Sequence, residues 1–153
     1  MIWKPRVTVA AVAERAGKFL VVEEQIDGKT CFNQPAGHLE DNESLTEAVV
    51  RECLEETAWH FSPTALVGIY RWRNPATSST YIRVTFAGEC TRHEPERELD
   101  ADITAAHWMN IDTILTLGEQ LRSPLVITSF EDYLDGRRYP IELLTDIDAG
   151  FAP

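Results

Sequence analysis

The strongest constraint on the fold of this chain is the stretch from residue 44 to residue 57. Ser44 is followed three residues later by Glu47, which is the spacing of a capping box at the start of a helix. From Leu45 to Thr57 the sequence contains neither glycine nor proline, and its apolar residues recur with the helical period of about 3.6. The pattern predicts a helix of about three and a half turns over residues 45–57.

Signals for β-strands lie on both sides of this helix. Turn signals at 15–18, at Asp27-Gly28 and at 74–79 separate short runs of apolar and β-branched residues, which predicts two hairpins. Ser123 and Pro124 mark the start of a late helix, and Gly136 stops it. The predicted strands cover residues 7–12, 19–22, 30–34, 65–72, 81–87 and 103–109, and the further helices cover 112–117 and 124–134. Because no repeat or linker divides the 153 residues, we expect one domain over 1–153, an α/β or α+β sandwich of layers.

Three glutamates crowd one face of the predicted helix. On a helical wheel Glu52, Glu55 and Glu56 share an arc of about 100°, in line with the apolar stripe of the helix. Glu52 and Glu56 repel each other as an i,i+4 pair, and all three lie near the helix C-terminus, where the macrodipole disfavours anions. A hard divalent cation, Mg²⁺ or Mn²⁺, would explain this arrangement. The alternative is a solvated acidic face.

The helix belongs to a longer motif that begins at Gly37. The spacing is Gly37, five residues, Glu43, seven residues and then the run from Arg51 to Trp59. It resembles the Nudix box, G-x5-E-x7-R-E-U-x-E-E-x-G-U, where U is a bulky apolar residue, and it occupies residues 37–59. The polar and glycine positions in register are Gly37, Glu43, Arg51, Glu52, Glu55 and Glu56. Agreement at six fixed positions is a specific signal.

Two positions depart from the family pattern. Cys53 stands where an aliphatic residue is usual, and Ala58 stands where the family has glycine. A residue with a side chain can hold a left-handed helix C-cap only at some cost, so the turn after Thr57 is open to change. Neither departure removes a metal ligand.

The resemblance implies a role for each matched position. Glu52, Glu55 and Glu56 would bind Mg²⁺, with Mn²⁺ as a possible substitute, and the backbone carbonyl of Ala36 would be a further ligand. Arg51 would orient a carboxylate of this cluster. The two remaining matched positions, Gly37 and Glu43, would be structural. The implied fold is the Nudix α/β/α sandwich, a mixed β-sheet between helices, which agrees with the pattern of strands and helices above.

A closer resemblance, to the NudJ-type phosphatases of the same family, covers residues 5–10, 17–24, 33–40 and 121–126. Those enzymes act on nucleoside di- and triphosphates and on the pyrophosphate of the thiamine pyrimidine precursor. The resemblance implies a Mg²⁺-dependent hydrolase of phosphoanhydrides, in which water attacks phosphorus while metal neutralises the phosphate oxygens. A carboxylate must take the proton of this water, and either Glu52 or Glu55 can do so.

Charged residues outside the box complete the expected site. Many family members place an acidic residue in the loop before a late strand, and Asp102 is our first choice and Glu98 our second. Either could instead be an ordinary acidic residue of a surface loop. Arg83 and Arg122 are the expected cations for the substrate phosphates, because each resembles an arginine of the NudJ-like sequences; a strand-edge or helix-cap role is the alternative.

Aromatic residues could supply a platform for a planar ring. Phe32, Tyr70 and Trp72 lie on segments expected near the site, although each could equally serve the core. Trp3 and Trp108 are assigned to packing.

Charge and composition narrow the partners. The formal net charge is -11, which opposes binding to nucleic-acid backbones and anionic membranes, so we expect a small-molecule phosphoanhydride as partner. The three cysteines form no CxxC pair, so no disulfide framework or cysteine zinc site is expected. No apolar stretch approaches the length of a membrane helix or of a signal-peptide core, which favours the cytoplasm. A monomer is the default oligomeric state, and a homodimer is the alternative.

Two other classes of function stay open from the sequence. A Nudix-fold sensor would bind a nucleotide or ADP-ribose without cleaving it, but such sensors can lose box carboxylates, and all three are present here. A purely structural or interaction domain with an acidic helix would show no metal dependence. P-loop, zincin and serine-hydrolase motifs do not occur.

Overall fold

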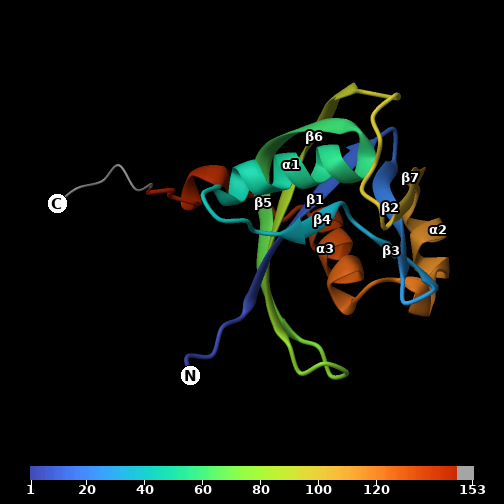
Figure 1. The fold of residues 1–153 in the computed structure, drawn as a ribbon. Helices are drawn as coiled ribbons and strands as arrows, with labels where there is room; N and C mark the ends of the chain where they lie inside the picture. Colours follow the sequence, from blue (N-terminus) through green and yellow to red (C-terminus); the bar gives the residue numbers. More distant parts are fainter. Residues whose placement is uncertain (148–153) are drawn as a thin grey trace.

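The computed structural model describes residues 1–147 as a sheet covered by helices on both faces (Figure 1). The strands are β1 (Arg6–Arg15), β2 (Lys18–Ile26), β3 (Lys29–Asn33), β4 (Ala36–His38), β5 (Trp59–Arg73), β6 (Thr80–His93), β7 (Ile103–Met109) and β8 (Tyr139–Pro140). The helices are α1 (Leu45–Thr57), α2 (Ile111–Thr116) and α3 (Pro124–Leu134), with 3₁₀ turns η1 (Gly118–Gln120) and η2 (Ile141–Leu143).

The eight strands form one mixed sheet. The main path runs β3-β2-β1-β6-β5-β8, with β4 paired to β1 and β7 paired to β2. β1 and β6 are parallel over eight registered residue pairs, whereas the other pairings are antiparallel. β1 therefore pairs with β2, β4 and β6, at the centre of the molecule.

The sheet is buried on both faces, and β1 shows why. Its side chains alternate between two hydrophobic cores, with Val9 and Ala11 packed in the core beneath α1 and Val12 in the core beneath α2 and α3. Phe86 of β6 contributes to the α1 core, while its neighbour Ala87 contributes to the opposite one. This arrangement confirms the predicted α/β sandwich with a mixed sheet between helices.

Helix α1 begins and ends where the sequence predicts. The Ser44 hydroxyl accepts a hydrogen bond from the Glu47 backbone N–H, and the Glu47 carboxylate accepts one from the Ser44 N–H. Ala58 adopts the left-handed conformation, with φ 61° and ψ 13°, and its N–H donates to the carbonyl of Leu54. The helix therefore ends in the same way as one with glycine at this position, and Ala58 carries the strain.

Some expectations need correction. The second hairpin is much longer than predicted, since β5 and β6 extend well beyond 65–72 and 81–87. Residues 36–38, which lie outside the predicted strands, form β4 because they pair with β1. The short β8 was not anticipated. Trp3 is 66% exposed, so its assignment to packing was wrong, whereas Trp108 packs against the α1 core.

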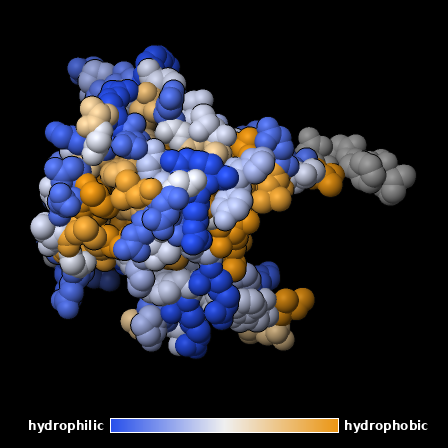
Figure 2. Space-filling view, turned by 180° about the vertical axis from the view of Figure 1, so that it is seen from behind, coloured by the Kyte–Doolittle hydropathy of each residue, from blue (hydrophilic) through white to orange (hydrophobic). Residues whose placement is uncertain are grey.

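The face opposite α1 carries two apolar areas, one over α2 and α3 and one over β5 and η2 (Figure 2). Exposed apolar residues of these elements are Leu115, Leu134, Ile69 and Leu143. Among the described residues, no helix is long and apolar enough to cross a membrane. The acidic groups of α1 lie on the other face.

Candidate active site

Helix α1 presents its carboxylates on its packing face rather than to solvent. Glu52 and Glu56 are 9% and 5% exposed, and they share the buried side of the helix with Ala48, Val49 and Cys53. The helix-wheel prediction that the acidic patch continues the apolar stripe is therefore confirmed. Ionised groups at such positions need a compensating charge.

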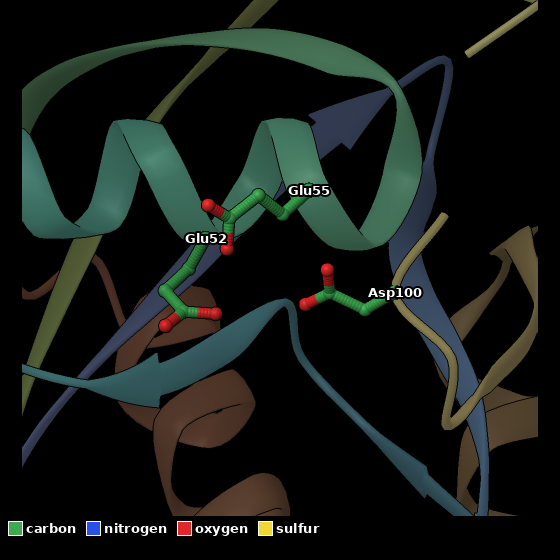
Figure 3. A group of neighbouring side chains, drawn as sticks. All are labelled: Glu52, Glu55 and Asp100. Atoms are coloured by element: carbon green, nitrogen blue, oxygen red, sulfur yellow. The ribbon is translucent and has the colours of Figure 1, made fainter. Parts of the chain in front are cut away.

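Three carboxylates from two segments point toward one another (Figure 3). Glu52 and Glu55 come from α1, and Asp100 comes from the loop between β6 and β7. One oxygen of each lies within 4.8 Å of those of the other two. The loop is tied to the helix because the Asp100 N–H donates to the Glu55 carbonyl over 3.0 Å. Clustered carboxylate oxygens suit a hard divalent cation.

Arg51 holds this acidic group in place. Its guanidinium donates two bonds to Glu43, of 2.7 and 2.9 Å, and its Nη1 donates to Glu52 over 2.8 Å and to Glu55 over 3.1 Å. Another bond reaches the His38 carbonyl at 3.0 Å. Hydrogen bonds from Arg51 lower the pKa of Glu43. Arg51 therefore joins the loop before α1 to two of the clustered carboxylates.

Gly37 and Glu43 occupy structural positions. A Cβ on Gly37 would fall on the carboxylate of Glu52, so any other residue at position 37 would displace that carboxylate. Glu43, besides pairing with Arg51, accepts a bond of 2.7 Å from the Glu40 N–H. Both residues shape the loop that positions the helix.

Ala36 connects β4 to the carboxylates through its backbone. The Ala11 N–H donates to the Pro35 carbonyl across the β1–β4 ladder, so Ala36 is at the next, non-hydrogen-bonded position. Its own N–H and carbonyl therefore face away from β1. The N–H donates to Glu56 Oε1 over 2.7 Å, and the carbonyl faces the same side. This orientation fits the carbonyl ligand that the resemblance implied.

The acidic groups have unusual proton affinities. Burial raises the pKa of Glu56 to about 9, assisted by Glu24, Glu52 and Asp100 and opposed by the bond from Ala36. Burial also raises the pKa of Glu52, against the effect of Arg51. In the absence of a divalent ion Glu56 would therefore keep its proton at neutral pH, and a divalent ion would displace it. The donor set, made of carboxylate and carbonyl oxygens, fits Mg²⁺ or Mn²⁺.

A cavity of about 280 Å³ adjoins the carboxylates. Glu56, Asp100 and Asp102 line it on the acidic side, and Arg83 and Arg122 add cationic groups. Gly37, His38 and Ala36 of β4 also line it. The cavity thus brings both arginines expected to bind phosphate to the same space as the carboxylates.

The two arginines differ in their surroundings. Arg83 is 5% exposed, and it donates to Gln34 Oε1 over 3.0 Å and to Asn33 Oδ1 over 3.2 Å. Burial lowers its pKa to about 10, so it remains charged at neutral pH. The Arg122 side chain is 42% exposed and lies 3.9 Å from Glu24 Oε2. Arg83 is therefore a fixed group of the wall, and Arg122 is a solvent-accessible one.

Of the aromatic residues, Trp72 lines the cavity and stacks on Tyr81 with ring centroids 5.7 Å apart. Phe32 instead packs in the core beneath α3, and it is not among the lining residues. Tyr70 lies in a separate cavity, where its hydroxyl donates to Asp132 over 2.8 Å. The structure thus brings Trp72, but neither Phe32 nor Tyr70, to the cavity.

In the acidic loop before β7, the residue that joins the carboxylate cluster is neither of the two expected from the sequence. Asp102, the first choice, lines the cavity but does not join the group of Glu52 and Glu55. Glu98 is exposed and is not among the lining residues. Asp100 joins the group, and sequence reasoning did not single it out. Its position relative to β7 gave no signal, because alternate acidic residues fill this loop.

Comparison with known proteins identifies the family. The NUDIX domain model matches residues 3–128. Phosphatase NudJ of Escherichia coli (strain K12) is 43% identical over 150 residues, which cover 98% of this chain and 97% of that protein. A NUDIX hydrolase from Nitrosomonas europaea is 46% identical with a TM-score of 0.94, covering 95% of this chain and 99% of the other.

The chain therefore belongs to the Nudix hydrolase family, and it is an enzyme that acts on phosphoric anhydrides of small molecules. The predicted family, fold and enzyme class are confirmed. A UDP-X diphosphatase, at 21% identity and a TM-score of 0.73 over 92% of this chain and 68% of the other, shows the same fold.

Proposed function

We propose that this enzyme uses Mg²⁺ to hydrolyse a phosphoanhydride bond in nucleoside di- or triphosphates or in a related pyrimidine pyrophosphate such as the thiamine pyrimidine precursor. One observation carries the proposal: the group of Glu52, Glu55 and Asp100 adjoins a cavity whose walls hold Arg83 and Arg122. Hydrolysis of a polyphosphate needs a metal ion, held by oxygen ligands, at the bond that breaks. It also needs cationic groups that bind the remaining phosphate oxygens. The similarity to the E. coli phosphatase supports the same chemistry.

The proposed metal ligands are Glu52, Glu55 and Glu56, the Ala36 carbonyl and, from the cluster, Asp100. When bound, Mg²⁺ would neutralise phosphate oxygens and make phosphorus more open to attack. Mn²⁺, which accepts the same oxygen donors, could replace it.

The residues of the chain do the remaining work. Arg122, the solvent-accessible arginine, binds phosphate oxygens, Arg83 contacts the substrate from the buried wall of the cavity, and Arg51 positions Glu52 and Glu55. A water oxygen forms a bond to phosphorus, the bond between phosphorus and the bridging oxygen breaks, and the phosphate or nucleotide leaves with that oxygen. Glu52 or Glu55 accepts the proton of the water. Asp102, which lines the cavity, is the third acidic group that could take this proton.

A sensor that binds nucleotide without cleaving it is the second function to test. Glu52, Glu55 and Glu56 are all retained, and Arg51 is bonded to two of them, which favours catalysis. A net charge of -11 opposes nucleic acid as a partner. A monomer is proposed, and light scattering would distinguish it from a homodimer.

The experiment compares hydrolysis of a panel of nucleotides and pyrimidine pyrophosphates with Mg²⁺, with Mn²⁺ and with chelator. Glu56→Gln removes a proposed ligand, and Glu131→Gln, an exposed residue on α3, is the matched control. We expect metal-dependent phosphate release that falls at least about 100-fold in Glu56→Gln and is unchanged in Glu131→Gln. Tight binding without phosphate release would favour the sensor. Hydrolysis that persists in chelator would contradict the proposed metal role.

A further inference from the structure

A buried acid outside the Nudix box faces the cavity. Glu24 of β2 is 9% exposed and lines the cavity together with Arg83. Beside it the pairing of β2 with β7 is irregular, with a register shift between Glu23 and Glu24. Irregularities of this kind redirect side chains next to sites. Glu24 is therefore positioned toward the cavity although it belongs to neither the acidic cluster nor the core.

Glu24 has hydrogen-bonding capacity that the described part of the chain leaves unused. Its Oε2 atom is buried and accepts no hydrogen bond there, and its nearest cationic atom is Arg122 Nη1 at 3.9 Å. A buried carboxylate oxygen without a donor is destabilising, because it has lost its hydrogen bonds to water without gaining others. A donor supplied by a ligand would remove that destabilisation.

Arg83 provides the complementary unused group. Its Nη1 and Nη2 atoms donate to Gln34 and Asn33, and Gln34 is itself held by a bond of 2.8 Å to the Val126 carbonyl. Its Nε–H, in contrast, is buried and has no acceptor among the described residues. Arg83 and Glu24 act on each other's charge without a hydrogen bond joining them. The residues that line the cavity thus include one with an unused donor, Arg83, and one with an unused acceptor, Glu24.

The cavity also has an aromatic wall. Trp72 and Tyr81 both line it and stack on each other with an interplanar angle of 28°. Flat aromatic surfaces favour flat heterocyclic rings, and the unused donor of Arg83 and acceptor of Glu24 suit a polar ring edge.

We propose that Glu24 is a specificity-determining residue, which accepts a hydrogen bond from an exocyclic amino group on the heterocyclic ring of the substrate. Arg83 Nε–H donates to the neighbouring ring nitrogen, and Trp72 flanks the ring. This inference rests on the proposed function, since it assigns the ring of the same substrate.

The preference for an amino group on the substrate ring follows from the Glu24 carboxylate, which can only accept hydrogen bonds. In a 4-oxo pyrimidine the ring N–H lies between two carbonyl oxygens, so a carboxylate that approaches it meets repulsion from both sides. In cytosine and in adenine the exocyclic amine lies beside an unprotonated ring nitrogen, so this edge offers a donor next to an acceptor. The oxo group and ring N–H of uracil and hypoxanthine reverse that order at both atoms. Carboxylate side chains pair with the cytosine amine in nucleic-acid recognition. The substrate class is therefore an amino-substituted pyrimidine or purine polyphosphate rather than its oxo counterpart.

The test uses pairs of substrates in which an amino group beside a bare ring nitrogen is replaced by an oxo group beside a ring N–H: CTP against UTP, and ATP against ITP. We expect wild-type kcat/KM to favour the amino member by about tenfold or more, since a site built for a hydrogen-bond donor rejects its oxo analogue. Glu24→Gln should abolish the preference, because the amide can donate to a ring oxygen as well as accept. Glu23→Gln is the matched control, since this neighbour pairs with His107 instead, and it should keep the preference.

An unchanged CTP to UTP ratio in Glu24→Gln would overturn the assignment, and so would equal loss of activity toward all four substrates. If thermal unfolding shows that Glu24→Gln does not fold, Glu24→Asp takes its place. This variant draws the carboxylate back by one methylene, and it must lower the ratio of kcat/KM for CTP to that for UTP. Calorimetric binding of the α,β-methylene analogues of CDP and UDP, which contain no phosphoanhydride bond, separates the two proposals. If wild type prefers the CDP analogue but cleaves none of the nucleotides, the ring assignment stands and the proposed hydrolysis fails. Equal binding of both analogues overturns the ring assignment alone.

Discussion

The contact between Gly37 and Glu52 gives the sharpest test of how the site is held. Replacing Gly37 with alanine adds a methyl group that falls on the Glu52 carboxylate. Gly37 is not among the residues with positive φ, so its backbone accepts alanine without strain, and the clash is the only cost. Because Arg51 bonds the same carboxylate over 2.8 Å, Glu52 can move aside only by breaking that bond.

The expected magnitude follows from these contacts. Overpacking a tight contact costs about 1–3 kcal/mol of the free energy of unfolding. In a Glu52→Ala background the clash is gone, and Gly37→Ala should then be neutral or stabilise by up to about 1 kcal/mol, because alanine restricts the unfolded chain. The two substitutions should therefore couple by about 2 kcal/mol.

Urea unfolding of the wild type, both single variants and the double variant measures this coupling. Kinetics supply a second readout: a carboxylate displaced by about 1 Å should lower kcat/KM of Gly37→Ala about 100-fold. Gly37→Ala would contradict the reasoning if it lowered the free energy of unfolding equally in the wild type and in Glu52→Ala. In that case the contact with the Glu52 carboxylate is not what requires glycine at position 37.

Three further predictions concern protons, the helix end and the acidic loop. Because burial raises the pKa of Glu56 to about 9, the folded chain binds more protons than the unfolded chain between about pH 4.5 and 9. The stability of the protein in chelator should therefore fall as the pH rises through this range. Thermal unfolding should show that Glu56→Gln flattens this dependence on pH. Ala58→Gly should relieve the left-handed strain and raise stability by about 1 kcal/mol, which is 2–4 °C in Tm, with kcat unchanged. In calorimetry Asp100→Asn should weaken Mn²⁺ binding by about tenfold or more, whereas Asp102→Asn should change it less than threefold. The reason is that, of these two residues, only Asp100 joins Glu52 and Glu55. A larger effect of Asp102→Asn would favour Asp102, the residue ranked first from the sequence.

Local rules were enough to predict the elements whose signals lie within a few residues. The capping box at Ser44 fixes the start of α1, and Ser123 followed by Pro124 fixes the start of α3. Both depend on side chains that bond their own helix end, so the neighbouring chain adds little. The positions of Glu52 and Glu56 on the packing face follow from helical periodicity for the same reason.

Elements that depend on distant partners were not predictable in this way. β4 is a strand because β1 pairs with it, and its three residues include a glycine and no β-branched side chain. Because they pair with each other, β5 and β6 continue far beyond their apolar centres, through polar residues such as His60 and Arg92. Propensity is a weak guide where pairing supplies the hydrogen bonds.

The active site divides along the same line. Its box residues are close in sequence and were named from the motif they share with the family, whereas Asp100 and Glu24 lie near them only because separate segments converge on one cavity. Glu24 shows the limit most clearly: in the sequence it is one of two adjacent glutamates on a strand, and period-two alternation sends one to each face. Which of the two faces the cavity depends on the order of strands around β2, and that order is set by the long-range pairings with β1, β3 and β7. The acidic residues of the helix could therefore be named from a short motif, whereas Asp100 and Glu24 could be placed at the cavity only with the fold.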